Sequence, residues 1–259
     1  MSLNQYGEWA LVTGGNSGIG LDFVEEIAKS KLNILLVSRN SLKNKTIIDL
    51  IKNKYSVEII ALNLDLSDSK NIKIVFNETK NYDIGLIILA SGYGISGEFL
   101  NHNLDSELNQ FDLNSRAVLE LVHTFANRFK NRKKSGIVLF GSLLGYQGVS
   151  LASNYAATKA YIQSLTEGLF YEFKKYNIDI ISCAPGPVKS NFAERANMKM
   201  SFAQSVKGIA KVTFSKLGKA STVTPGFLSK LLTYSLNTAP RGIRTLILNK
   251  IMKGMAIND

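Results

Sequence analysis

The stretch Trp9-Ala10-Leu11-Val12-Thr13-Gly14-Gly15-Asn16-Ser17-Gly18-Ile19-Gly20 joins a short apolar run to a glycine-rich turn. After the turn, apolar side chains recur at Ile19, Phe23 and Ile27 with the spacing of a helix. The order therefore predicts a buried strand, a tight turn and a helix. A helix that starts directly after such a turn points its free N–H groups into it, which favours binding of a phosphate group.

Glycines at positions 14, 18 and 20 would let the backbone of this turn approach a pyrophosphate closely. Their spacing is Gly-x-x-x-Gly-x-Gly rather than the common Gly-x-Gly-x-x-Gly, and a glycine-rich turn can also be a turn without a ligand. Its position after the first strand favours the cofactor interpretation. The residues expected to contact the cofactor here are Thr13, Gly14, Asn16, Ser17, Gly18, Ile19 and Gly20.

The alternation of strand and helix continues along the chain. Apolar runs predict further strands at residues 33–37, 57–62, 85–89, 137–140 and 179–183, and helical periodicity predicts helices at 41–54, 68–79, 104–130 and 155–176. Strands that are apolar throughout are typical of a sheet buried on both faces. The expected fold class is therefore α/β, with a doubly wound, Rossmann-like parallel sheet and ligands at the carboxyl ends of its strands.

The 259 residues, 45% of them hydrophobic, are enough for one domain. With four prolines and no low-complexity run, we expect a single domain spanning residues 1–259. Beyond residue 185 the pattern loosens. Residues from about 191 to 218, with Met198, Met200, Phe202 and Phe214, predict a substrate flap with short helices, and residues from about 226 to 259 predict a basic amphipathic tail.

Three polar residues predict an acid–base apparatus at one strand end. Ser142 follows the apolar run 137–140, Tyr155 comes thirteen residues later, and Lys159 lies one helical turn beyond Tyr155. The phenol of tyrosine has a pKa of about 10, and we expect the adjacent ammonium and the helix N-terminus to stabilise the phenolate. The Ser142 hydroxyl could then hold a substrate oxygen.

Tyr171 and Lys175 repeat the same spacing, with a hydroxyl at Thr158 thirteen residues before Tyr171. Thr158 and Tyr171 would lie on one helix, however, about 20 Å apart. The loop before Tyr155, by contrast, contains glycines and lets the chain fold back towards Ser142. Only the first triplet can therefore converge on one point.

At the end of the second strand, where NAD-binding folds usually carry an acid for the ribose 2′-hydroxyl, this chain has Ser38 and Arg39. With no carboxylate expected at that corner, Arg39 could hold a 2′-phosphate, so we expect NADP(H) to be preferred over NAD(H). The alternative is a surface arginine without a ligand. Asp65, after the third strand, could bond the adenine amino group or cap the next helix, although Ser67 and Asp68 are better placed as caps.

Taken together, these features resemble the short-chain dehydrogenase/reductase family, from about residue 8 to residue 191. In that family the tyrosine donates or accepts the proton, the lysine lowers its pKa and binds the nicotinamide ribose, and the serine orients the carbonyl. The resemblance implies these roles for Tyr155, Lys159 and Ser142, which form the expected catalytic set with Asn114. The matching elements are Thr13-Gly14-x-x-x-Gly18-Ile19-Gly20, Asp65, Asn114, Ser142, Tyr155-x-x-x-Lys159 and Pro185-Gly186-x-Val188-x-Ser190.

Two further roles are implied by the resemblance alone. Asn114 resembles the helix residue of that family that holds a water for proton relay, and the alternative is a buried polar side chain bonded to backbone. The segment 185–190 resembles the loop that fixes the nicotinamide carboxamide. Its residues expected to contact the cofactor are Pro185, Gly186, Val188 and Ser190.

The chain departs from the family after the fourth strand. It reads Leu89-Ala90-Ser91-Gly92 where Asn-Asn-Ala-Gly is usual. Gly92 keeps room for the cofactor, but sheet-bridging hydrogen bonds from the missing asparagine side chains are not expected here. No catalytic group is lost.

We expect an NADP(H)-dependent carbonyl reductase or alcohol dehydrogenase that acts on an apolar ketone or acyl-type substrate by hydride transfer, with tyrosine as general acid or base. A non-catalytic NADP(H)-binding sensor or scaffold is the alternative, because one fold can host many functions. Apolar flap residues could also simply pack on the domain. The side chains expected around the substrate are Tyr93, Ile95, Leu143, Leu144, Tyr146, Pro187 and Phe192.

The net charge of +11 favours anionic partners, although we interpret the basic residues as dispersed over a solvated surface. No nucleic-acid-binding signature accompanies them, and two histidines and one cysteine argue against a His/Cys metal site. We therefore expect neither nucleic acid nor metal. Cys183 alone cannot form an intramolecular disulfide, and the N-terminus lacks a signal-peptide pattern, so a cytoplasmic protein is expected.

In the tail, Ile243, Leu246, Ile247 and Ile251 lie at helical spacing with arginines and lysines nearby. A basic amphipathic helix of this kind can lie on an anionic membrane, cap the substrate pocket or form a subunit contact. These three alternatives stay open on the sequence, and a homo-oligomer is expected.

Overall fold

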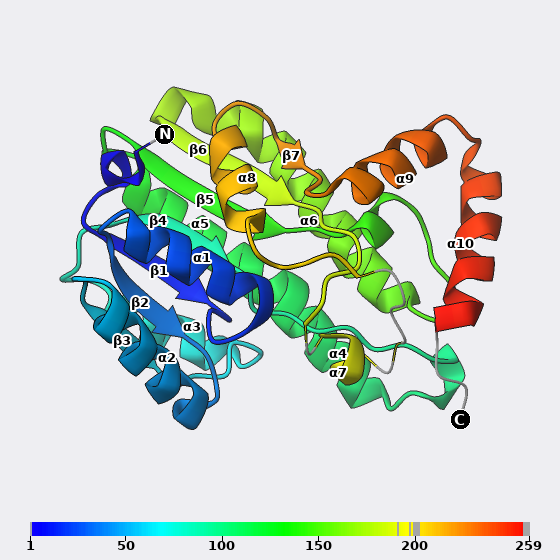
Figure 1. The fold of residues 1–259 in the computed structure, drawn as a ribbon, viewed down its shortest axis with the longest axis horizontal. Coiled ribbons are helices and arrows are strands. Elements are labelled where there is room, and N and C mark those ends of the chain that lie inside the picture. Colours follow the sequence, from blue (N-terminus) through cyan, green and yellow to red (C-terminus); the bar gives the residue numbers. More distant parts are fainter. Residues whose placement is uncertain (1, 191, 197, 199–202, 256–259) are drawn as a thin grey trace.

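A computed structural model describes residues 2–190, 192–196, 198 and 203–255. Seven parallel strands form one sheet in the order β3-β2-β1-β4-β5-β6-β7, which confirms the expected doubly wound α/β fold (Figure 1). The chain reverses its winding between β3 and β4, so a crevice opens beside the carboxyl end of β1. The strands are β1 (Trp9–Thr13), β2 (Asn33–Val37), β3 (Ile59–Leu62), β4 (Ile84–Leu89), β5 (Ser135–Phe140), β6 (Ile178–Cys183) and β7 (Thr222–Val223).

Helices cover both faces of this sheet (Figure 1). In the described part of the chain they are α1 (Gly18–Lys29), α2 (Ser41–Lys54), α3 (Ser69–Glu78), α4 (Leu104–Phe111), α5 (Ala117–Phe129), α6 (Ser153–Glu172), α7 (Phe192–Arg195), α8 (Ile209–Lys216), α9 (Phe227–Asn237) and α10 (Arg241–Met255). The short strand β7 was not predicted. It pairs with the end of β6 through Ser182↔Thr222 and Cys183↔Val223.

Alternate strand residues point to opposite faces and build two separate cores. Val12 and Leu36 pack with α1, α2 and α8 in one core, whereas Leu11 and Leu35 pack with α3, α5 and α6 in the other. All four side chains are at most 1% exposed. Burial on both sides explains why these strands are apolar throughout and why the glycine turn after β1 has a fixed position.

The expected flap at residues 191–218 is only partly a flap. Its second half forms α8, which packs beside α1 through Phe214 and Phe23, with ring centroids 5.1 Å apart. The Asp22 carboxylate accepts hydrogen bonds from the backbone N–H groups of Gly208 at 3.0 Å and Ala210 at 2.7 Å, at the start of α8. Residues 208–218 therefore belong to the layer on the sheet. Asn191, Met200 and Phe202 lie outside the described residues.

The long helix predicted at 104–130 is divided by a π-helical segment at Asp112–Arg116. Asn114 sits in this segment, and its side-chain amide exchanges two hydrogen bonds with the backbone of Tyr93, at 3.1 and 2.8 Å. A π-helical turn adds a residue and rotates the following helix, and such turns are frequent at functional sites.

The predicted tail consists of two helices, α9 and α10, at the end of the molecule away from β3 (Figure 1). The face of α10 that turns inward carries Leu248 and Met252, whereas Ile243, Leu246 and Ile247 are exposed. Among the described residues, no helix is both long and apolar enough to cross a bilayer. Residues 256–259 of the expected tail lie outside the described part.

Replacement of Phe23 by alanine should lower the free energy of unfolding by about 3 to 5 kcal/mol. The fully buried Phe23 ring lies edge-on to both Phe140 and Phe214, 5.3 and 5.1 Å away, so truncation leaves a cavity between α1, β5 and α8. Chemical denaturation measures the loss. Phe99→Ala, at a ring that is 58% exposed, is the matched control and should change stability by less than about 0.5 kcal/mol; equal losses would contradict this packing.

Candidate active site

One cavity of about 420 Å³ lies along the carboxyl ends of the strands. At one end it is lined by the glycine turn and by the residues that follow β2 and β3, which are polar. At the other end it is lined by apolar side chains of α9 and α10. Of the residues predicted to bind the cofactor, all except Thr13 line it: Gly14, Asn16, Ser17, Gly18, Ile19, Gly20, Ser38, Arg39, Asp65, Gly92, Tyr155, Lys159, Pro185, Gly186, Val188 and Ser190.

The glycine turn lies against the end of β4. Gly14 has a φ of +65°, and a Cβ at this position would lie 2.8 Å from the backbone nitrogen of Ser91. Thr13 supports the same approach, because its hydroxyl accepts a hydrogen bond from that nitrogen at 3.0 Å. Thr13 therefore positions the backbone instead of lining the cavity. It also supplies a link between β1 and β4 in a chain that lacks the usual asparagines after β4.

Bare backbone and the N-terminus of α1 make this turn fit a dinucleotide. A Cβ on Gly20 would lie 2.3 Å from the carbonyl oxygen of Gly14, so only glycine allows this close packing. The first N–H groups of α1 face the cavity from Gly18 onward, where they favour a phosphate group. The residues present therefore fit the pyrophosphate of a nicotinamide cofactor.

A buried asparagine that the sequence analysis missed holds together the corner of the cavity at the ends of β2 and β3. Asn44 of α2 is 1% exposed and donates a hydrogen bond to Asn63 at 2.7 Å. Its amide oxygen accepts from Asn16 at 3.0 Å and from Ser38 at 2.5 Å. The signal was present, since Asn44 shares the inward stripe of α2 with Ile47 and so places a polar group where an apolar one is usual.

Arg39 and Asp65 face each other across this corner, with Nη1 and Oδ2 3.2 Å apart. The expectation that the corner lacks a carboxylate is therefore wrong, because a residue distant in sequence supplies one. Burial raises the pKa of Asp65, but hydrogen bonds from Ser67 and Arg39 outweigh it and hold the pKa below its usual value. Asp68 caps α3 by accepting from the backbone N–H of Lys70 at 2.9 Å, as predicted.

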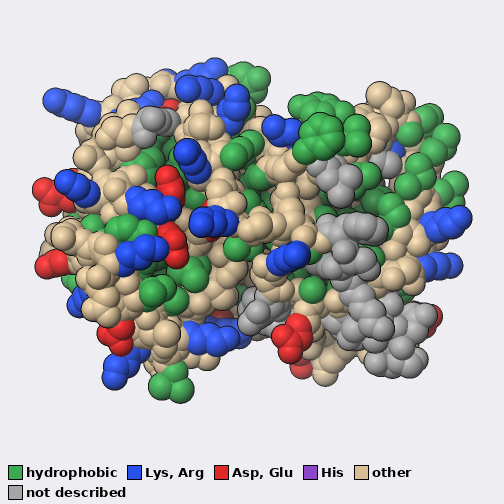
Figure 2. All heavy atoms as spheres, in the orientation of Figure 1, with side chains coloured by type: hydrophobic (Ala, Val, Ile, Leu, Met, Phe, Trp, Pro, Cys, Tyr) green, Lys and Arg blue, Asp and Glu red, His purple; other side chains and the backbone are tan. Residues whose placement is uncertain are grey.

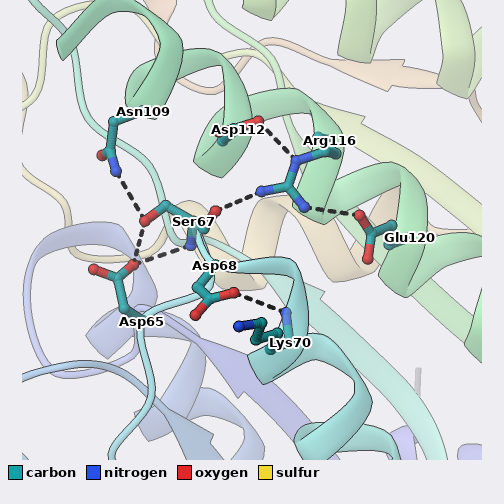
Figure 3. Close-up of polar contacts among 8 residues, drawn as sticks. All are labelled: Asp65, Ser67, Asp68, Lys70, Asn109, Asp112, Arg116 and Glu120. Atoms are coloured by element: carbon teal, nitrogen blue, oxygen red, sulfur yellow. Dashed lines mark hydrogen bonds and ion pairs between the residues drawn. The ribbon is translucent and has the colours of Figure 1, made fainter. Parts of the chain in front are cut away.

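Figure 3 shows how the loop after β3 is fixed to the α4–α5 region. Ser67 donates to Asp65 at 2.8 Å and accepts from Asn109 of α4 at 2.9 Å. The Arg116 guanidinium bonds the carbonyl oxygen of Ser67 and pairs with Asp112 and Glu120 at 2.7 and 2.8 Å. The π-helical segment that carries Asn114 is thereby tied to the residue that pairs with Arg39.

Helix α6 presents three polar side chains, one turn apart, to the end of β5. The hydroxyl of Tyr155 lies close enough to the side chain of Ser142 for the serine to lower the pKa of the phenol. The ammonium of Lys159 donates to the carbonyl oxygen of Phe140 at 2.9 Å, and Gln163 accepts from the backbone N–H of Ser142 at 3.2 Å. The predicted triplet therefore converges. Gln163, which the sequence analysis missed, continues its spacing and holds Ser142 in place.

Burial dominates the protonation of this group. It raises the pKa of Tyr155 to about 12, against a smaller lowering by the hydrogen bond with Ser142. It also lowers the pKa of Lys159 to about 8, because a buried ammonium loses its hydration. The expected stabilisation of the phenolate is thus outweighed, although Lys159 Nζ lies 5.6 Å from the centre of the Tyr155 ring. Tyr155 carries a firmly held proton.

Gly92 leaves an opening between Asn114 and Lys159. A Cβ on Gly92 would lie 2.8 Å from Asn114 Oδ1 and 3.7 Å from Lys159 Nζ. Asn114 itself does not line the cavity; its amide bonds the Tyr93 backbone and the hydroxyl of Thr158. This geometry matches the alternative given for Asn114, a buried polar side chain bonded to backbone. A water relay at this residue remains a prediction.

The loop 185–190 closes the cavity opposite the glycine turn. Its start is joined to the Ser142 region, because Leu143 N–H donates to the carbonyl oxygen of Pro185 at 3.1 Å. Its end faces Gly18, because a Cβ added to Gly18 would lie 3.4 Å from Ser190 Cβ. The Ser190 hydroxyl accepts from the backbone N–H of Phe192 and so starts α7.

The apolar end of the cavity is a third hydrophobic cluster that includes Tyr155 itself. The Phe192 ring lies 5.5 Å from the Tyr155 ring, and Leu248 and Met252 of α10 pack against the same group. The expected pocket residues Ile95 and Tyr146 do not line the cavity. The expected residues that do line it are Tyr93, Leu143, Leu144, Pro187 and Phe192, joined by Met198, Leu232, Leu248, Ile251, Met252 and Met255.

Comparison with known proteins shows which protein family the chain belongs to. The family described as short chain dehydrogenase matches residues 8–201, and the chain belongs to this family. It is therefore an oxidoreductase that acts on CH–OH or C=O groups. A 7beta-hydroxysteroid dehydrogenase of Clostridium sardiniense is 27% identical over 256 residues, which cover 97% of this chain and 98% of the relative.

Solved structures share the fold. A structure from a study of 7beta-hydroxysteroid dehydrogenase stereoselectivity matches with a TM-score of 0.88 at 22% identity, covering 96% of this chain and 99% of the other. The bulky-bulky ketone specific alcohol dehydrogenase from Comamonas testosteroni matches with a TM-score of 0.78 at 25% identity, covering 92% and 94%. Structures of this fold include complexes with NADPH and with NAD.

The buried ammonium of Lys159 should make stability depend on pH. Its pKa is about 8 in the folded chain against 10.5 for an ordinary lysine. Between these values the unfolded chain binds more protons, so stability rises with pH. Without added cofactor, the free energy of unfolding of the wild type should gain about 2 kcal/mol relative to Lys159→Met between about pH 7 and about pH 10.

Denaturation of both proteins across this pH range measures the difference, and the paired variant removes the contribution of all other groups. Parallel curves would show that Lys159 keeps its ordinary pKa and is not desolvated as described.

Proposed function

We propose that this protein is an NADPH-dependent reductase of ketones that carry bulky apolar groups. The observation that carries the proposal is the placement of the Tyr155 and Ser142 hydroxyl groups between two unlike halves of one cavity. One half fits a phosphate-rich dinucleotide, and the other is walled by apolar side chains. A carbonyl group held at this boundary would face both hydroxyl groups.

Bound NADPH would supply the hydride for the carbonyl carbon. Tyr155 donates a proton to the oxygen as negative charge develops there, and the Ser142 hydroxyl donates a hydrogen bond to the same oxygen. The high pKa of Tyr155 supports the reducing direction, because the phenol is protonated at neutral pH. The backbone bond from Ser142 to Gln163 keeps the serine in position.

Lys159 acts on Tyr155 through charge and placement. Its bond to the Phe140 carbonyl holds the ammonium under the tyrosine ring, where a positive charge favours release of the phenolic proton. Lys159 and Asn114 lie on either side of Gly92, which supports a path for returning a proton to Tyr155.

Three features support NADP(H) over NAD(H). Arg39 and Lys43 both line the cavity beside the end of β2. The N-terminus of α2, a helix of fourteen residues without an acid in its first turn, starts at the same corner. Asp65 accepts two hydrogen bonds from Ser67, so its charge stays partly compensated when the guanidinium of Arg39 turns to a 2′-phosphate.

The apolar half of the cavity supports the substrate class. Its walls come from the loop after β5, from α7 and from α10, so a wide, flat carbonyl compound would be enclosed on several sides. The similarity to a hydroxysteroid dehydrogenase and to a bulky-bulky ketone specific alcohol dehydrogenase agrees with this class.

Tyr155→Phe should abolish ketone-dependent NADPH oxidation, with turnover reduced by a factor of about 100 or more, because the proton donor is removed while the ring remains. The NADPH dissociation constant, measured by fluorescence, should stay within about threefold of wild type. Tyr171→Phe, at the exposed tyrosine with the same lysine spacing, is the control and should leave turnover unchanged. Wild-type turnover in Tyr155→Phe would refute the assignment, and NADPH binding without turnover of any ketone by the wild type would favour the sensor alternative.

Arg39→Ala should raise the dissociation constant for NADPH by about ten- to a hundredfold, because a charge-assisted hydrogen bond to the 2′-phosphate is lost. Affinity for NADH, which lacks that phosphate, should change little. Isothermal titration with both cofactors measures the ratio. Lys45→Ala removes the same charge from an exposed position of α2 that does not line the cavity, and it should leave the ratio unchanged. An unchanged ratio in Arg39→Ala would contradict the preference.

A further inference from the structure

The net positive charge of the chain comes almost entirely from its last quarter. Residues 195–258 contain eleven arginines or lysines and no aspartate or glutamate, whereas residues 1–194 contain twenty basic and nineteen acidic residues. Nearly the whole net charge of +11 therefore comes from the segment that includes α8, α9 and α10. The basic residues themselves are spread along the chain, and the excess arises because this segment lacks acidic residues.

The same segment exposes large apolar side chains on two helices. On α9, Phe227 and Tyr234 are 83% and 71% exposed and lie on one face with Leu231. On α10, Leu246 is 69% exposed and its neighbours Ile243 and Ile247 are also exposed. Figure 2 shows hydrophobic and basic side chains together over this end of the molecule. Lys230, Arg241, Lys250 and Lys253 are the exposed basic residues of the two helices.

We propose that α9 and α10 form a docking surface for a membrane that contains anionic lipids. Exposed apolar side chains on a helix that lies in the interface enter the boundary of the acyl region, while lysine and arginine bind anionic headgroups. Residues 195–258 contain no acidic residue, and this composition favours an anionic lipid surface over a second copy of the chain. Two copies of this surface would bring like charges together, whereas an anionic lipid surface complements them.

The inner sides of the same helices line the apolar half of the cavity. Leu232 of α9 and Leu248 and Met252 of α10 contribute to its wall. Ser150 donates a hydrogen bond to Asn249 at 2.5 Å, which holds α10 against the segment that leads into α6. A membrane docked on the outer sides would lie next to the apolar end of the cavity. Supply of an apolar substrate from the membrane to the cavity rests on the proposed function, whereas lipid binding does not.

Sedimentation with vesicles tests the proposal. The full chain should bind vesicles of phosphatidylcholine mixed with phosphatidylglycerol, should not bind phosphatidylcholine alone, and should be released by high salt. The variant Leu246→Ser/Lys250→Glu should bind at least about tenfold more weakly. Leu42→Ser/Lys52→Glu makes the same two changes at exposed residues of α2 and should bind as the wild type does.

Circular dichroism confirms that both variants are folded, and NADPH oxidation in the absence of vesicles should be the same in both, since none of the four residues lines the cavity. Failure of the wild type to bind the anionic vesicles would overturn the proposal, as would equal weakening by the two double variants. Self-association that is lost in Leu246→Ser/Lys250→Glu, with no vesicle binding, would also overturn it and assign the surface to a second copy. An inactive protein that still binds vesicles would refute only the proposed function.

Discussion

The hydrogen bonds between α6 and the end of β5 are the constraint on which the site depends. Lys159 and Gln163 bond the backbone of Phe140 and Ser142, and Tyr155 lies beside the Ser142 side chain, so one helix face positions both hydroxyl groups. The arrangement buries an ammonium, at a cost that appears as its lowered pKa. In the proposed reaction this charge lies beside the phenol that exchanges a proton, so the proposed function would account for the loss of stability.

Backbone contacts bring the rest of the cavity to this point. Thr13 and Gly14 hold the glycine turn against β4, and the loop after β3 is tied through Ser67 to the π-helical segment that carries Asn114. A further hydrogen bond joins the end of β4 to the same region, because the Tyr93 hydroxyl donates to Asn109 of α4 at 2.9 Å. The corner at the ends of β2 and β3 and the region around Tyr155 are therefore parts of one hydrogen-bonded frame, and a shift at one would disturb the other.

Features that depend on short stretches of sequence were predicted. The succession of strands and helices along the chain, the glycine turn and the spacing of Ser142, Tyr155 and Lys159 follow from periodicity and helix geometry, and the structure places them as expected. Contacts between distant residues were not predicted. The Arg39–Asp65 pair, the Asn44 cluster and the packing of α8 on α1 require knowledge of which strands are neighbours. The pKa of Tyr155 was misjudged because burial, which no short motif reports, raises it more than the contact with Ser142 lowers it. The three alternatives for the tail stayed open on the sequence, because helical spacing identifies an apolar face but does not show which face turns inward.

The central claim is that a carbonyl carbon receives hydride at the point where Tyr155 and Ser142 meet the cavity. The most direct test incubates the wild type with a bulky apolar ketone and NADPH that is deuterated at C4. Mass spectrometry then locates the deuterium in the product. The account predicts an alcohol that carries one deuterium on the former carbonyl carbon when the transferred position of NADPH is labelled, and none when the other C4 position is labelled. NADPH oxidation with no deuterium on that carbon in either case would contradict it.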